Sequence, residues 1–390
     1  MKKLCVFLLK IGISVAILAF LFYQAAGATD ENGNSLFTRL WQGQKDWSAL
    51  SVGFAFSFLA VLITIVRWWW LVRLQKVPAK LLDTLRIGYV GYLFNLAPMG
   101  IVGGDLLKVW LLARHEKNTP NASAAIFAAA FLDRMMGLYA LFMLASISIL
   151  CAGVLTHPET SQVLYGISVA VLAAWGAGTV AGLAILIPPF KKPVSAENPD
   201  MLEEPETPNA PDTSNAPNAS NAAKTPSTPK ASKTPKTFRA KLAHFTRETV
   251  HSVRMYRQFP VQLILALAVC LLIHTLFAMS LFFLAKGIWT DLPIPTLAQH
   301  MYISPASNST SAIPLPFGPY EAVLDLLYRD VIGTEAVGRG LIAALAYRIV
   351  CVIIATLGIV FYLTDRSEIR STMAEHEAPA EKPETSPENQ

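Results

Sequence analysis

The chain has 390 residues, of which 53% are hydrophobic and only 15% are charged. Soluble domains average about 25% charged residues, so this deficit excludes an ordinary soluble enzyme. Together with several apolar runs near 20 residues, it predicts an all-α polytopic membrane protein. The net charge of +5 is modest and gives no reason to expect a nucleic-acid partner.

Residues 1–48 are predicted to hold a first transmembrane helix, over the apolar run Leu4 to Gln24, followed by an external loop. A cleaved signal peptide is the alternative, because Ala25 to Asp30 is a loose cleavage match. Residues 49–189 are predicted to form a first membrane half. Its first span, Ala49 to Val72, ends in Arg67-Trp68-Trp69-Trp70, the pattern of an arginine beside an aromatic interface belt.

Two apolar segments follow, Leu81 to Ala97 and Val102 to Ala113, and each is shorter than the roughly 20 residues that a span requires. Pro98 and several glycines lie between them, so residues 81–114 are predicted to be a re-entrant pair of half-helices. Such a break is tolerated only where protein or a wet cavity satisfies the backbone. One interfacial helix plus a short span is the alternative. Two full spans, Ala124 to Gly153 and Val163 to Ile187, complete this half.

Residues 190–236 are rich in Pro, Asn, Ala, Ser and Thr and are predicted to be a disordered linker. Residues 237–259 regain helical spacing with basic side chains, which indicates either an interfacial helix on anionic lipid headgroups or an extension of the next span. Residues 260–364 form a second membrane half, with spans at Val261 to Ala285 and Val337 to Leu363 and a second re-entrant pair at 296–331. Residues 365–390 are predicted to be a disordered acidic tail.

Lysine and arginine gather beside the span ends on one side of the predicted topology, which places that side in the cytoplasm. The topology has eight apolar segments by simple hydropathy, interpreted as about six full spans and two re-entrant hairpins. We therefore expect a multi-pass protein of the plasma (inner) membrane with both termini cytoplasmic. The first hairpin then enters from the cytoplasm and the second from outside, which is the geometry of an inverted repeat.

One pattern occurs in both halves. Pro98 precedes Asp105 by seven residues, and Arg134 follows 29 residues later; Pro314, Glu321 and Arg348 repeat the order with spacings of seven and 27. Charged side chains inside a membrane are costly unless paired or wetted, and they mark functional sites by default. The repeat therefore predicts a transporter whose charged sets close around one polar cavity.

The glycines before Asp105 allow close backbone approach, and Lys108 lies one turn further on the same helix face. Adjacent helical residues face different ways, so Asp133 and Arg134 are expected to have different partners, with Arg134 pairing with Asp105. The candidate substrate-binding residues are Asn95, Gly103, Gly104, Asp105, Lys108, Asp133, Arg134, Tyr320, Glu321, Tyr347 and Arg348. Structural ion pairs and a capping carboxylate beside a snorkelling lysine are the alternatives.

A polar cluster between Ser304 and Ser311 is predicted to line a wet cavity or to pack on protein, unless the segment is an external loop. The cysteines and histidines have no metal-ligand spacing, so no metal or cofactor is expected. Phosphate loops, dinucleotide fingerprints, HExxH motifs and nucleophile elbows are absent, and no catalytic residue is assigned.

The residues just named resemble the membrane region of lysylphosphatidylglycerol synthases and the wider flippase-like integral membrane family. The resemblance rests on Arg67-Trp68, Asn95 to Pro98, Gly103 to Asp105, Lys108, Asp133-Arg134, Pro316 to Glu321 and Arg348. It implies movement of an aminoacylated phospholipid between leaflets. The chain lacks the family's C-terminal aminoacyl-transferase domain and carries the long linker between its halves, so lysyl transfer is not implied.

We therefore expect a lipid flippase that moves an anionic or modified phospholipid, or a lipid-linked precursor, between leaflets. Two other functions stay open: a membrane transferase acting on a lipid-linked substrate, and a non-catalytic membrane partner of a separate lipid- or glycan-modifying enzyme. The first would leave a covalently altered lipid, and the second would depend on the linker.

Overall fold

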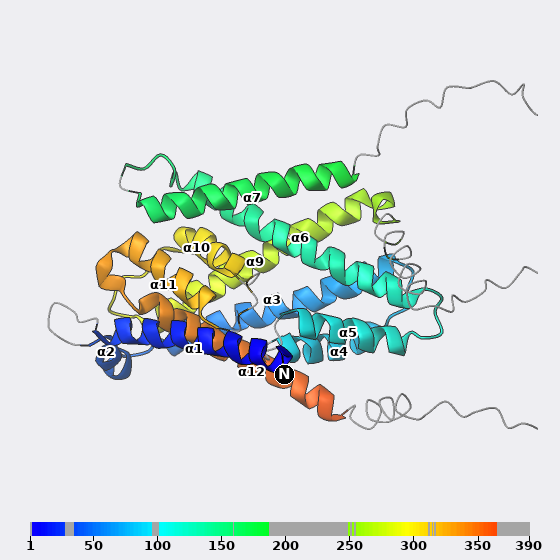
Figure 1. Ribbon diagram of the computed structural model, residues 1–390, viewed down its shortest axis with the longest axis horizontal. Coiled ribbons are helices and arrows are strands. Elements are labelled where there is room, and N and C mark those ends of the chain that lie inside the picture. The colour runs from blue at the N-terminus through cyan, green and yellow to red at the C-terminus, as the bar shows by residue number, and fades with distance from the viewer. Residues whose placement is uncertain are drawn as a thin grey trace, which may run out of the picture.

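The computed structural model describes residues 2–27, 35–95, 101–158, 160–186, 249, 252, 255–310, 313, 315 and 317–364. Within these ranges the regular structure is helical (Figure 1). The predicted linker at 190–236, the acidic tail at 365–390 and most of the basic segment at 237–259 lie outside the described residues.

Five described helices are long and apolar enough to cross a membrane. They are α3 (Trp47–Leu74), α6 (Ala122–Cys151), α7 (Gln162–Leu186), α9 (Pro260–Ile288) and α12 (Arg339–Thr364). Helix α1 (Lys2–Gly27) has 26 residues, which is about 39 Å of helix and enough for a sixth span. The all-α polytopic fold predicted from the sequence is confirmed, and the predicted external loop contains a short helix, α2 (Leu36–Gln42).

Both predicted broken pairs are present as pairs of short helices that pack against each other. The first is α4 (Leu81–Asn95) with α5 (Ile101–His115), and the second is α10 (Leu297–Ser309) with α11 (Pro319–Ile332). Each helix has 13 to 15 residues, or roughly 20–23 Å, which is short of the ~30 Å hydrocarbon core. The pairs lie at opposite ends of the bundle, with α4 and α5 at the end where α7 finishes and α9 begins (Figure 1). We call this the linker end and the other the far end.

The starts of these helices follow from their sequences. The Asp46 side chain accepts hydrogen bonds from Ser48 and Ala49 and so caps α3. These bonds hold the pKa of Asp46 below its ordinary value, with the largest contribution from the Ser48 hydroxyl and smaller ones from the two backbone amides. Thr296 and the residue three positions later form a capping box that begins α10. Gly318, at φ 107°, precedes the proline that opens α11. That left-handed backbone angle is one that only glycine adopts without strain.

The contacts between helices follow an internal symmetry. Helices α3 and α9 pack against each other, as equivalent members of the two halves. Helix α4 of the first hairpin packs on α12, and α10 of the second hairpin packs on α6. Helices α6 and α12 run in opposite directions along the bundle (Figure 1). These contacts of one half thus have counterparts in the other, as two repeats related by a pseudo-two-fold axis in the membrane would produce.

The α3–α9 contact is close because small residues meet there. Ser57 and Ser280 share a hydrogen bond of 2.6 Å between their hydroxyls, and the Ser280 hydroxyl also donates to the Gly53 carbonyl at 2.7 Å. A Cβ at Gly53 would lie 2.9 Å from the Leu284 side chain. Small residues with interhelical hydrogen bonds are the usual means of bringing membrane helices close together.

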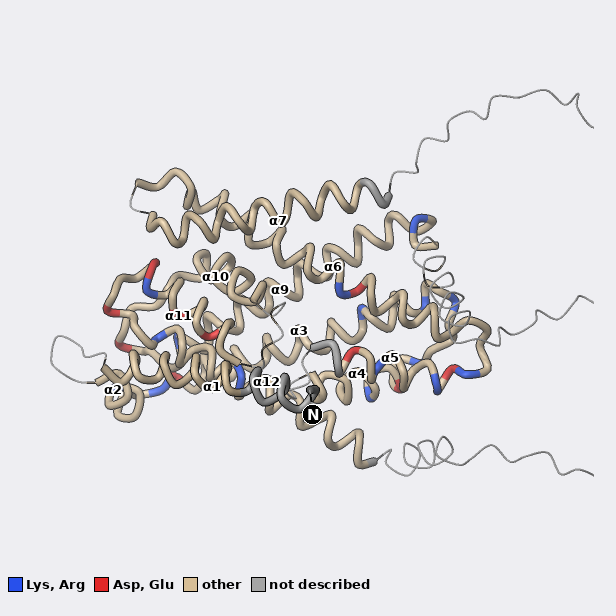
Figure 2. Tube along the Cα trace, in the orientation of Figure 1, with Lys and Arg blue, Asp and Glu red and all other residues tan. Residues whose placement is uncertain are grey.

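Apolar clusters fill both ends of the bundle. At the linker end, Trp68 and Leu71 pack with Ile126, and at the far end Ile303 and Leu324 are buried together. Figure 2 shows charged residues at both ends of the bundle and also within it, as in α6, whereas α7 carries none along its length. Helix α7 exposes apolar side chains, among them Val169, Val180 and Leu183, as expected of a helix that faces lipid.

The short 3₁₀ helix η1 (Tyr256–Gln258) lies immediately before α9. Its Tyr256 is buried and donates a hydrogen bond of 2.8 Å to the Leu71 carbonyl at the end of α3. The backbone leaves helical geometry at Phe259, where φ is −123° and ψ is 55°. The described part of the basic segment is therefore anchored to the bundle and is not a straight continuation of α9.

Candidate functional site

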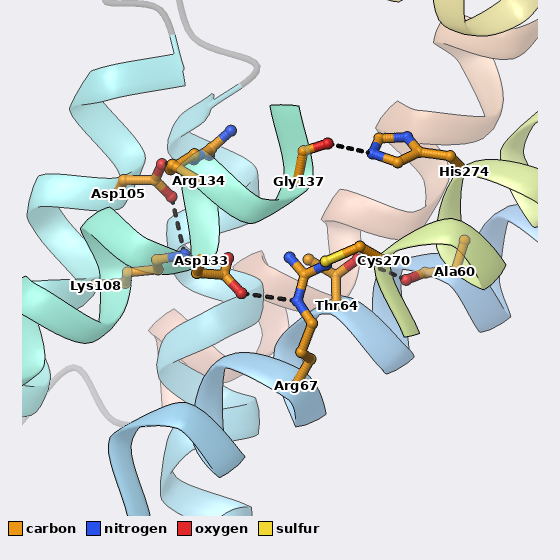
Figure 3. A network of polar contacts seen from close by, with 10 residues as sticks. All are labelled: Ala60, Thr64, Arg67, Asp105, Lys108, Asp133, Arg134, Gly137, Cys270 and His274. Atoms are coloured by element: carbon orange, nitrogen blue, oxygen red, sulfur yellow. Dashed lines mark hydrogen bonds and ion pairs between the residues drawn. The ribbon is translucent and has the colours of Figure 1, made fainter. Parts of the chain in front are cut away.

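Asp105, Lys108 and Arg134 come together at the first hairpin (Figure 3). Helix α5 carries Asp105 and Lys108 one turn apart, and the Lys108 ammonium lies 3.0 Å from Asp105 Oδ1. Arg134, on α6, donates its Nε–H to the other carboxylate oxygen of Asp105. The pairing of Arg134 with Asp105 that the repeat predicts is therefore present.

The three charged side chains differ in burial. The side chains of Asp105 and Lys108 are 14% and 11% exposed, whereas that of Arg134 is 42% exposed. The Lys108 ammonium also lies 4.7 Å from the centre of the Trp68 ring, where the negative face of the indole favours a cation. Lys108 is thus held from two sides, and Arg134 is the accessible cation of the set.

Close contact between α4 and α5 explains the glycine beside Asp105. A Cβ at Gly104 would overlap the Gly91 carbonyl oxygen and the Asn95 side-chain oxygen. Gly103 also lies in α5, and Asn95 is the last residue of α4. The Asn95 side-chain oxygen is buried and has no hydrogen-bond partner among the described residues.

Glu321 and Arg348 form the second set. Arg348, on α12, donates from Nε to Glu321 Oε1 at 2.9 Å, and the Gly318 amide donates to Glu321 Oε2 at 2.7 Å. Glu321 is fully buried, while the Arg348 side chain is 31% exposed. The guanidinium carbon of Arg348 lies 5.5 Å from the ring centres of both Phe317 and Tyr320. This carboxylate therefore has a partner on each oxygen, and its arginine lies over two rings.

The two candidate tyrosines pack together beside the second set. The Tyr320 and Tyr347 rings have centroids 6.1 Å apart, and Tyr347 also meets Phe277 edge-on at 6.2 Å. Tyr320 is buried in α11 and Tyr347 is half-buried in α12. Both candidates thus border the Glu321–Arg348 pair.

Asp133 has a different partner from its neighbour Arg134, as the helix geometry predicts. Arg67 Nε donates to Asp133 Oδ1 at 2.8 Å, and both side chains are about 5% exposed or less. Arg67 Nη1 also contacts Cys270 Sγ at 2.5 Å, so the pair joins α3, α6 and α9 (Figure 3). One turn along, His274 donates to the Gly137 carbonyl at 2.9 Å.

This arrangement corrects the interpretation of Arg67 as an interfacial residue. Arg67 and Trp68 are buried, because α6 and α9 cover this part of α3. The signal that identifies Arg67 is the unmatched Asp133 in an apolar span, which requires a cation from another helix. Asp133 therefore belongs to a closed interhelical pair rather than to the accessible set.

The polar cluster of the second hairpin packs on protein, which is one of the two arrangements that the sequence left open. Ser304 and Ser307 are buried in α10, which lies against α6 and α9. The Ser309 hydroxyl donates to the Ala306 carbonyl, and the Thr310 hydroxyl to the Ser307 carbonyl. The helix backbone thus satisfies two of these hydroxyl groups, whereas the buried Ser307 hydroxyl has no hydrogen-bond partner among the described residues.

Metal ligands do not gather within the described ranges: no group of three or more His, Cys, Asp or Glu side chains there could hold a metal ion.

The two candidate sets, Asp105–Lys108–Arg134 and Glu321–Arg348, are each assembled by direct contacts. Their convergence on one central cavity stays a prediction.

Comparison with known families finds a match over the first half of the chain. Residues 7–194 match the model of the family described as the lysylphosphatidylglycerol synthase TM region. Over these residues, the chain is similar to this family. The resemblance stated from the sequence motifs is thereby confirmed, and the match contains the Asp105–Lys108–Arg134 set together with the Arg67–Asp133 pair. No curated protein matches the chain.

The family and the apolar helices together define the protein at a coarse level. It is a multi-pass membrane protein, and the family that residues 7–194 match is tied to lipid modification or transport. The second set, Glu321 and Arg348, lies beyond the matched residues, and its likeness to the first set rests on the repeated spacing and contacts alone.

Proposed function

We propose that the protein moves a phospholipid or a lipid-linked precursor between the two leaflets of a membrane. The observation that carries this proposal is the pair of acid–arginine sets, each held where a half-helix hairpin meets a membrane span. The two hairpins lie at opposite ends of the bundle (Figure 1), and in the proposed orientation each would present its set to a different leaflet. This is the arrangement that a carrier with two access states requires.

The physical task of such a carrier is to lower the cost of bringing a charged headgroup into hydrocarbon. Arginine suits this task because its planar guanidinium has five N–H donors and can hold a carboxylate and a phosphate together. In the proposed mechanism the phosphate approaches Arg134 while Asp105 keeps the guanidinium oriented, and the acyl chains stay in lipid. Arg348 plays the corresponding part at the far end.

The location and partners of the protein are part of the proposal. Charge placement supports an orientation with the linker end and both termini in the cytoplasm, and we assign the protein to the plasma (inner) membrane. The basic segment at 237–259 would then meet anionic headgroups on the cytoplasmic leaflet, and a separate lipid-modifying enzyme would supply a modified substrate. No resident cofactor is assigned.

Reconstitution in liposomes tests the proposal. The full chain is inserted into vesicles with headgroup-labelled lipids on one leaflet, and the accessibility of the label is followed with time. Wild type should exchange the label faster than the Asp105→Ala and Arg134→Ala variants. Lys117→Gln, which removes an exposed cation from the α5–α6 loop, should behave as wild type.

Equal exchange by wild type and both site variants, across a broad panel of lipids, would show that these groups do not move lipid. Mass spectrometry of the same vesicles provides a second reading. Recovery of a covalently altered lipid would contradict transport as the activity and support a transferase.

A further inference from the structure

The two halves differ at the positions beside the repeated carboxylate. Aligned on Asp105 and Glu321, the preceding residue is Gly104 in the first half and Tyr320 in the second. Three residues after the carboxylate, Lys108 in the first half corresponds to Leu324 in the second, which is fully buried. The repeat thus keeps its acid and its arginine but changes the charge around them.

The second set is electrically balanced, its carboxylate is buried, and an aromatic ring lies over its guanidinium. One carboxylate, Glu321, faces one guanidinium, Arg348, at 2.9 Å. The Gly318 amide occupies the other carboxylate oxygen, and the Tyr320 ring lies over the guanidinium. Since the tip residues 311–319 carry no ionisable side chain, the sequence adds no further charge there.

The first set has one positive charge in excess. Lys108 and Arg134 share the single carboxylate of Asp105. The other acid in α6, Asp133, is occupied by Arg67 at 2.8 Å. Residues 96–104, which include the tip of the first hairpin, contain no ionisable side chain that would restore the balance.

This excess charge lies beside an apolar, exposed surface. Arg134 is 12 residues into α6, or about 18 Å of helix from its first residue. Its neighbours Phe131 and Met135 on α6 and Leu106 on α5 are 49%, 44% and 52% exposed. A cation in such a place is unfavourable unless an anion accompanies it, and the surrounding side chains are of the kind that contact acyl chains.

We propose that the Asp105–Lys108–Arg134 set is the loading site for a phospholipid whose headgroup carries one net negative charge. The phosphodiester bridges Arg134 and Lys108 and brings the set to neutrality, and an acyl chain lies along Leu106, Phe131 and Met135. This deepens the proposed function and rests on it, since it assigns a headgroup class to the same site. A zwitterionic headgroup leaves the positive charge uncompensated, and a cationic headgroup adds to it.

Lipid binding to the purified full chain tests this assignment without requiring transport. Native mass spectrometry from detergent micelles compares phosphatidylglycerol with phosphatidylcholine of the same acyl chains. Wild type should prefer phosphatidylglycerol by about tenfold or more, since one charge-assisted contact is expected to contribute at least that factor. Lys108→Met should reduce the preference to near unity, and Lys117→Gln should leave it unchanged.

Asp105→Asn is the decisive second variant because it raises the net charge of the set and should strengthen the preference. A folding defect cannot produce such a gain. The assignment is overturned if wild type shows no preference, if Lys108→Met retains it in full, or if Asp105→Asn weakens it. Inorganic phosphate that displaces the lipid completely would also overturn it.

The two proposals fail in different ways. A strong charge preference in binding, together with no exchange of any lipid in vesicles, would reject transport and keep the loading site. Exchange of lipids without a charge preference would reject the loading site and keep transport.

Discussion

The buried Arg67–Asp133 pair makes a sharp prediction about stability. Arg67→Met and Asp133→Leu each remove one partner, and the double variant removes both while keeping side chains of similar volume. The pair is a suitable target because its atoms are 2.8 Å apart and its side chains are 5% and 4% exposed. The buried contact from Arg67 to Cys270 ties the pair to a third helix.

The expected magnitudes follow from this burial. Removing one member of a buried pair leaves an uncompensated charge and costs about 3–5 kcal/mol of unfolding free energy. Replacing both members with apolar groups is often close to neutral, so the double variant should be more stable than either single one. An ordinary interhelical hydrogen bond in a membrane contributes only about 0.6 kcal/mol on average. The size of the loss therefore distinguishes a buried ion pair from an ordinary hydrogen bond.

Equilibrium unfolding in mixed micelles, followed by circular dichroism, measures all four proteins. Lys117→Met is the matched control, because it changes the same kind of residue at an exposed position and should shift stability by about 0.5 kcal/mol or less. The reasoning fails if both single variants cost less than about 1 kcal/mol. It also fails if the double variant is less stable than both single ones.

Two further predictions test the hairpin contact and the topology. Gly104→Ala should sharply lower the yield of folded protein, since its Cβ would overlap the Gly91 carbonyl oxygen. Gly182→Ala is the control, because a Cβ there has open space and should be tolerated. Similar yields of the two variants would exclude a close α4–α5 crossing. Single cysteines at the exposed positions Lys117 and Glu335, in a background without the native cysteines, should react with impermeant reagents from opposite sides of the membrane. Labelling of both from one side would contradict the inverted repeat.

Much of the fold is predictable because local physics determines it. The lengths of the apolar runs separate full spans from half-helices, and Pro98 together with the glycines after it marks the first break. The repeated spacing also predicts the partner of Arg134, since two carboxylate–arginine sets with the same order indicate the same contact. These predictions need no knowledge of the partner helices.

The role of Arg67 was not predictable in this way. An arginine beside three tryptophans near the end of a span has the pattern of an interface belt, and only tertiary packing shows that α6 and α9 cover it. The closed pair with Asp133 then follows from burial rather than from sequence position. The charge excess at Lys108 has the same origin, because it depends on which acids are already occupied.

The cross-packing of the halves gives the two sets a physical connection. The first hairpin contacts α12, which carries Arg348, and the second hairpin contacts α6, which carries Arg134. A shift of either hairpin therefore presses on the helix that holds the arginine of the other set. Because packed interfaces move between discrete arrangements rather than deforming continuously, opening one set to lipid favours a matching rearrangement at the other. If the protein moves lipid as we propose, an anionic headgroup binds at the charged, accessible set rather than at the neutral one, and this difference concerns binding affinity rather than the direction of net transport.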